Sequence, residues 1–277
     1  MWKAMRRLAF LLLLPVLAFV AAGCGSGGAL ELDPVASAAT KTQQTGTYAF
    51  DFTASVHVLG RPLSFSGSGQ VDGPNGALDM QIDFGSLLPA SLTQSAPATA
   101  DVRLVDKVAY VNVPFLASKL PSGKPWLKLD LRSLAGSAGL GSVSQSDPQQ
   151  YLQQLLASKN TQTVGTDTIA GEKMTHYRTT IDPSARLGAL PADVRAAARK
   201  ALKQLGTKGI PADVWVDSQG LLRRESVSLA FGQALQGASM SMTMNFHDFG
   251  TPVDVAAPPA DQTFDATSLV PSAKPKP

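Results

Sequence analysis

The sequence contains few residues that can cross-link or ionise. Among its 277 residues there is one cysteine, Cys24, and only 16% are charged, against about 25% in an average soluble domain. A single cysteine excludes a disulfide within the chain. The three positive charges of residues 1–23 account for the formal net charge of +3, so the remainder is formally neutral. Because the chain has no basic patch, we predict no nucleic-acid partner.

Motifs for catalysis and for metal or cofactor binding are also missing. The three histidines are scattered, and none has a second histidine or an acidic residue at metal-ligand spacing. A nucleophile elbow and a phosphate-binding loop are absent, and the Gly/Ser stretch 136–141 lacks the strand-turn-helix context of a dinucleotide site. Asp79 and Asp83 share the polar face of one predicted strand, where solvation is the simpler interpretation than acid–base chemistry. We therefore predict that the protein is not an enzyme and uses no cofactor or metal.

The one long apolar run lies at the N-terminus. A positively charged segment, 1–7, precedes an apolar stretch from 8 to 22. This stretch is shorter than the about 20 residues that a membrane-spanning helix needs, and it has the length and flanks of a secretory signal. The sequence AAGC at 21–24 resembles the lipobox of bacterial lipoproteins, although Ala21 stands where leucine is most usual. In those proteins diacylglycerol is attached to the cysteine, and the signal is cleaved before it.

This resemblance implies a domain organisation and a location. Residues 1–23 are the expected signal peptide, and residues 24–33 are the lipidated Cys24 with a flexible tether. The lipid would anchor the protein to the extracytoplasmic face of the cell membrane. Residues 34–258 are expected to form one folded domain, and 259–277 a flexible C-terminal tail. An ordinary secreted protein with a chance cysteine is the alternative.

Alternating apolar and polar residues dominate the domain and predict strands. We expect about ten of them, at 48–58, 63–71, 78–84, 101–113 (as two strands), 125–131, 161–170, 173–181, 212–217, 221–231 and 239–246. Helices are predicted at 34–44, 147–158 and 191–205, the first two with Asp33 and Asp147 as N-caps.

So few helices cannot cover both faces of such a sheet, which must curl around them or close on itself. We therefore predict an α+β fold in which a curled antiparallel β-sheet, or half-barrel, of about ten strands packs on two or three helices. A curled sheet with helices on its concave side can leave an apolar hollow.

The element order and several short phrases resemble a known family. The phrases are VGT at 164–166, IAGE at 169–172, THY at 175–177 and DVWVDSQGLLRR at 213–224. Over residues 35–255 the chain is similar to the actinobacterial LppX/LprG-type lipoproteins, which share the fold of the periplasmic carrier LolA. The resemblance implies a half-barrel with a lipid-sized cavity and the carriage of acylated lipids or lipoproteins.

The apolar stripes supply candidate ligand-binding residues, for which filling of the core is the alternative. The candidates are Phe50, Phe52, Phe65, Met80, Ile82, Phe84, Met242 and Met244. Methionine is flexible and suits surfaces that accept varied apolar ligands. We predict a monomeric, membrane-anchored envelope lipoprotein that binds acylated lipid or lipoprotein in an apolar cavity as a carrier. The alternative is a non-enzymatic envelope sensor or protein-interaction module.

Overall fold

The computed structural model divides the chain into two units, residues 1–32 and 33–277. Its described residues are 33–58, 61–85, 97–121, 123–134, 158–184, 209–230 and 238–267, with isolated positions at 152, 155, 156, 187, 195, 196, 199, 200 and 202. The predicted signal peptide and Cys24 lie outside these residues. Among the helices that the structure describes, none has the length and apolar character needed to cross a bilayer.

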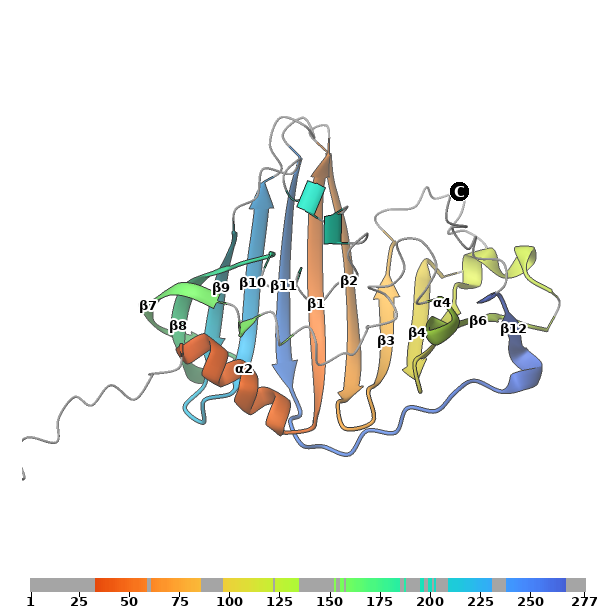
Figure 1. Ribbon diagram of the computed structural model, residues 1–277, viewed down its shortest axis with the longest axis horizontal. Coiled ribbons are helices and arrows are strands. Elements are labelled where there is room, and N and C mark those ends of the chain that lie inside the picture. Colours follow the sequence, from red (N-terminus) through yellow and green to blue (C-terminus); the bar gives the residue numbers. More distant parts are fainter. Residues whose placement is uncertain are drawn as a thin grey trace, which may run out of the picture. The chain divides into compact units, whose positions relative to one another are not determined.

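One twelve-stranded sheet forms the framework of the second unit (Figure 1). Its strands are β1 (Thr47–Val58), β2 (Arg61–Asp72), β3 (Ala77–Asp83), β4 (Thr99–Val105), β5 (Val108–Asn112), β6 (Trp126–Asp130), β7 (Ser158–Ile169), β8 (Glu172–Ile181), β9 (Ile210–Val216), β10 (Leu222–Ala230), β11 (Ser239–His247) and β12 (Thr263–Asp265). Their spatial order is β12-β6-β5-β4-β3-β2-β1-β11-β10-β9-β8-β7. The sheet is thus two antiparallel meanders, β1–β6 and β7–β11, joined where β11 pairs with β1.

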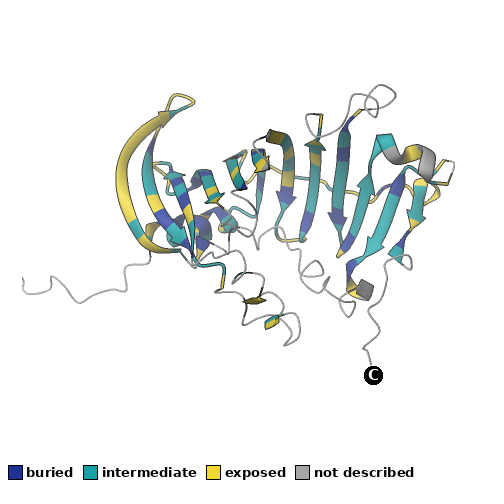
Figure 2. Ribbon diagram, turned by 90° about the horizontal axis from the view of Figure 1, so that it is seen from above, coloured by how far each residue is buried: buried dark blue, intermediate teal, exposed yellow. Residues whose placement is uncertain are grey.

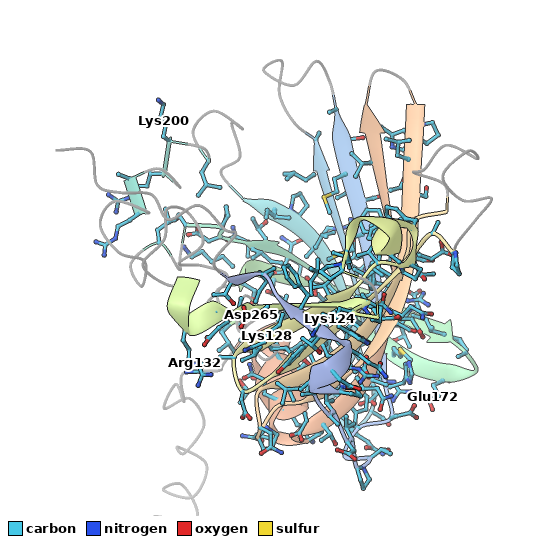
Figure 3. All side chains as sticks on the ribbon, turned by 90° about the vertical axis from the view of Figure 1, so that its right-hand side faces the viewer. Lys124, Lys128, Arg132, Glu172, Lys200 and Asp265 are labelled. Carbon is cyan, nitrogen blue, oxygen red and sulfur yellow. The ribbon has the colours of Figure 1, made fainter. Side chains whose placement is uncertain are left out.

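The sheet is open and curled, and it is larger than the about ten strands that the alternation predicts. The added strand is β12, which pairs in parallel with β6 inside the segment expected to be a tail. A three-residue strand gives too short a pattern to recognise, and contacts with β6 hold this one. Lys128 forms an ion pair with Asp265 at 2.9 Å, and the Lys124 Nζ donates to the Thr263 carbonyl oxygen at 3.0 Å. Figure 3 shows these side chains gathered at the β6–β12 edge.

Helix α2 (Pro34–Gln44) begins as predicted, because Asp33 caps it and proline occupies its first turn. The Asp33 Oδ1 accepts hydrogen bonds from the Val35 and Ala36 amides at 2.9 and 3.2 Å, which satisfies two of the donors that a helix N-terminus leaves open. The other described helices are short: η1 (Pro114–Lys119), α4 (Leu131–Leu134) and η4 (Ala260–Gln262).

Only α2 among the predicted helices is described along its whole length, so the structure describes fewer helices than expected. Of the predicted helix 147–158, Leu152 and Leu155 are described as helical, and both are fully buried. Of the predicted helix 191–205, only isolated positions between 195 and 202 are described, again as helical.

The core lies on the apolar face of the sheet, where α2 packs against β7, β9 and β10. The buried residues of the core come from α2, from the sheet and from positions 152 and 155. They are Val35, Ala38, Ala39, Tyr48, Phe50, Phe52, Val71, Leu152, Leu155, Ile181, Ala212, Val214, Val216, Leu222 and Phe246. Figure 2 shows buried positions recurring along the central strands, whereas the edge strand β7 is mostly exposed. The apolar face continues beyond the helix, across β11, β1, β2 and β3.

Candidate apolar binding groove

An open groove of about 310 Å³ lies on this continuation of the apolar face. Side chains from β1, β2, β3 and β11 line it: Tyr48, Phe50, Phe52, Val71, Leu78, Met80, Met242, Met244 and Phe246. Hollows of about 480 and 520 Å³ on the polar face are larger. Both linings include hydroxyl and carboxylate side chains, among them Ser55 and Asp83 in the first hollow and Asp51 and Asp79 in the second. An alkyl chain would leave these groups without water, so the two hollows suit it less well.

Two glycines of β2 leave room for the two aromatic rings that form the floor of the groove. Phe50 and Phe52 on β1 lie opposite Gly69 and Gly67, respectively. A Cβ at Gly67 would come within 2.6 Å of the Phe52 ring, and one at Gly69 within 2.7 Å of the Phe50 ring. Because no real Cβ contact is that short, both rings lie over β2 only where it lacks side chains. Both rings line the groove.

Methionines border these rings on two sides. Met244 lies opposite Phe52 on the neighbouring strand β11, and Met242 lies opposite Ala54. On the far side, Met80 of β3 lies opposite Gly69. All three methionines are partly buried. Their unbranched thioether side chains can change rotamer to fit ligands of different shape.

Five of the eight candidate residues line the groove: Phe50, Phe52, Met80, Met242 and Met244. The other three lie farther along the same face. Phe65 contacts Phe52, with ring centroids 6.1 Å apart, and Phe84 contacts Phe65 at 6.3 Å. Ile82 packs against the core cluster.

The sequence reasoning missed four lining residues: Tyr48, Val71, Leu78 and Phe246. Each belongs to the same alternating stripe as a chosen candidate, so the signal was present. What was missing is the register, which places Val71 opposite Tyr48 and Leu78 opposite Val71. That a ligand binds to any of these residues remains a prediction.

On the polar face, one network ties the edge strand β7 to its neighbours. The His176 Nε2 lies 2.7 Å from an Asp213 oxygen, and its Nδ1 lies 3.3 Å from an Asp167 oxygen. Trp215 stacks on the imidazole at 4.4 Å between ring centroids, and its indole N–H donates to Asp167 at 2.7 Å. Through these contacts His176 and Trp215 connect the strands β7, β8 and β9. Within the described part of the chain, no cluster of three or more potential ligands could hold a metal ion.

No family model matches the chain. Among solved structures it is similar to LppX of Mycobacterium tuberculosis, with 18% identity, 81% of this chain and 100% of that chain covered, and a TM-score of 0.46. For LprF of Mycobacterium bovis the identity is 15%, the coverage 84% and 99%, and the TM-score 0.45.

Two curated proteins from Streptomyces match by sequence. An uncharacterized 31.2 kDa protein of Streptomyces griseus, from the rplA-rplJ intergenic region, is 28% identical over 252 residues, which cover 87% of this chain and 81% of that protein. A putative lipoprotein of Streptomyces coelicolor is 25% identical over 249 residues, covering 86% and 78%. The chain resembles the LppX/LprG-type lipoproteins of actinobacteria. This resemblance to LppX/LprG-type lipoproteins confirms the one that the sequence phrases predicted.

Proposed function

We propose that the protein is a membrane-anchored envelope lipoprotein that binds the acyl chains of a lipid or lipoprotein and serves as their carrier. The observation that supports this most is the groove of about 310 Å³, whose lining residues in the described part of the chain are all aromatic, aliphatic or methionine. The predicted anchor at Cys24 would keep this groove beside the membrane that supplies the ligand.

The energetics favour long acyl chains over small apolar molecules. Each buried methylene contributes about 0.8 kcal/mol, so a dozen of them contribute about 10 kcal/mol. Association costs about 4–15 kcal/mol in lost translation, rotation and ordering. Since the two quantities are similar, we expect a short apolar molecule to bind weakly and an acyl chain that fills the groove to bind measurably. Such binding needs no specific polar contact, which is consistent with the absence of a recognisable site motif in the sequence.

An open groove suits a carrier better than a sealed core does. A ligand can enter and leave over the methionines without separating α2 from the sheet. The aromatic floor stays fixed because Phe50 and Phe52 are largely buried, at 7% and 8% exposure. Adaptable walls over a fixed floor allow chains of different length and saturation to bind.

Mass spectrometry of lipids extracted from the purified protein tests this function. The full chain carrying Cys24→Ser is produced in an actinobacterial host, so that no covalent anchor contributes acyl groups. We expect acylated species in near-stoichiometric amount. The double variant Met242→Gln, Met244→Gln should lose most of them, whereas Ser241→Gln, on the opposite face of β11, should retain them. Extracts without acyl species would contradict the carrier role and favour the sensor or interaction module.

A further inference from the structure

Glu225 on β10 has an unusual position for a charged residue. It is only 3% exposed, and it is the only charged side chain among the described residues that are buried. Burial of a carboxylate in an apolar environment is costly unless hydrogen bonds or ions compensate it. Glu225 has such an interaction within the fold. Well-packed hydrophobic residues often fill such positions at similar or lower cost, so packing alone does not explain a carboxylate here.

The register places this carboxylate beside the groove. Glu225 lies opposite Met244 of β11 on one side and opposite Val214 of β9 on the other. Met244 lies in turn opposite Phe52, and both line the groove. Directly opposed residues of antiparallel strands have Cα atoms about 4.5–5.5 Å apart. Glu225 therefore lies one strand beyond Met244, on the same face of the sheet and next to the β11 side of the groove.

A carboxylate in this position distinguishes between lipid head groups. When ionised it only accepts hydrogen bonds, and its two oxygens offer about four lone-pair sites, so it can serve a partner in the fold and a ligand together. A hydroxylated head group can donate to it. The ionised carboxylate of a free fatty acid has no hydrogen to donate, so it gains nothing there and meets a like charge.

We propose that Glu225 is a specificity-determining residue of the groove: it selects acylated ligands whose head group carries hydroxyl donors, as in an acylglycerol, over free fatty acids. The head group lies toward β10 and the acyl chain runs over Phe52 and Phe50 toward β3. This inference rests on the proposed function, because it assumes that the groove binds acyl chains.

Three probes with chains of the same length and different ends test it: 1-monoolein, sodium oleate and 1-octadecene, titrated at pH 8 into the delipidated full chain carrying Cys24→Ser. We expect monoolein to bind about tenfold tighter than oleate, the ratio that one charge-assisted hydrogen bond supplies. In Glu225→Gln the amide can donate to oleate, so the ratio should fall to about threefold or reverse. Octadecene, which has no head group, should bind with equal affinity to the Glu225→Gln protein and to the protein that keeps Glu225.

Glu172→Gln is the matched control, because Glu172 is exposed and pairs with Arg223 at 3.3 Å away from the groove. It should keep the wild-type ratio. Equal binding of monoolein and oleate by the unsubstituted groove would overturn the inference even if Glu225→Gln failed to fold. An unchanged ratio in a folded Glu225→Gln protein would do so as well. Failure of all three probes to bind would instead contradict the proposed function, and with it the inference.

Discussion

The ring of Phe50 on β1 lies over Gly69 on β2, its direct partner in the antiparallel ladder. A Cβ at position 69 would come within 2.7 Å of the Phe50 Cζ and 2.6 Å of the Asp79 carbonyl oxygen. The aromatic floor of the groove therefore depends on a position without a side chain. Both contacts come from tertiary pairing rather than from the local sequence around Gly69.

Replacement of Gly69 by alanine should disturb both the fold and the groove. The added methyl group must displace the Phe50 ring and strain the β2–β3 pairing, which typically costs about 1–3 kcal/mol. Urea unfolding should show that loss in the free energy of unfolding, together with weaker binding of an apolar fluorescent probe. Gly165→Ala is the control, since nothing lies within 4 Å of a Cβ there. Equal stabilities of the two variants would refute the steric account.

Thr42 connects α2 to the sheet through a buried hydrogen bond. Its Oγ1 accepts from the Leu222 amide at 2.9 Å, and both residues are fully buried. Thr42→Val keeps the shape but leaves that amide without its acceptor, which costs about 1–3 kcal/mol. Thr40→Val, on the same helix, removes a hydroxyl that only donates to the Ala36 carbonyl oxygen, and should change the free energy of unfolding by less than about 0.5 kcal/mol. Denaturant unfolding of both variants measures whether loss of the bond to the Leu222 amide costs more than loss of the bond to the Ala36 carbonyl oxygen.

The ion pair at the β6–β12 edge should make a small contribution to stability that depends on pH. Hydrogen bonds from the Thr267 side chain, and then from Lys128, lower the pKa of Asp265 from 3.8 to about 2. Since the folded state binds the proton less tightly than the unfolded chain, the contribution is complete above about pH 4 and disappears as the pH falls toward 2.

Asp265→Asn should therefore lower the free energy of unfolding by at most about 1 kcal/mol at pH 7, because the carboxylate is largely exposed. The difference from the unsubstituted protein should shrink below pH 4. Unfolding curves recorded between pH 2 and pH 7 measure it. A difference that stays constant over this range would show that the charge of Asp265 is not what holds β12.

Cys24→Ser should abolish lipid attachment and the cleavage that follows it. Serine has no thiol for alkylation, so metabolic labelling with a fatty acid should disappear, and the chain should keep residues 1–23 and run as the longer, uncleaved form on a denaturing gel. Ser26→Ala, within the predicted tether, should stay labelled and be cleaved. Retention of label in Cys24→Ser would disprove the predicted anchor.

The sequence by itself determined the local structure. Alternation with a period of two is a property of consecutive residues, so it located β1 to β11 within a few residues, and the Asp33-Pro34 pair marked the start of α2. The same pattern chose which side chains face the apolar side. It therefore found Phe50, Phe52 and the methionines of the groove before their neighbours were known.

Only the tertiary structure decided which strands lie side by side. The pairing of β1 with β11 joins positions almost two hundred residues apart along the chain, and no local pattern encodes it. That pairing brings Phe246 beside Phe50 and places Glu225 one strand from the groove. The tertiary structure also determines β12, because this three-residue segment is a strand only through its pairing with the edge of β6. Register and partner choice depend on contacts between distant segments, which is why they appear only in the folded chain.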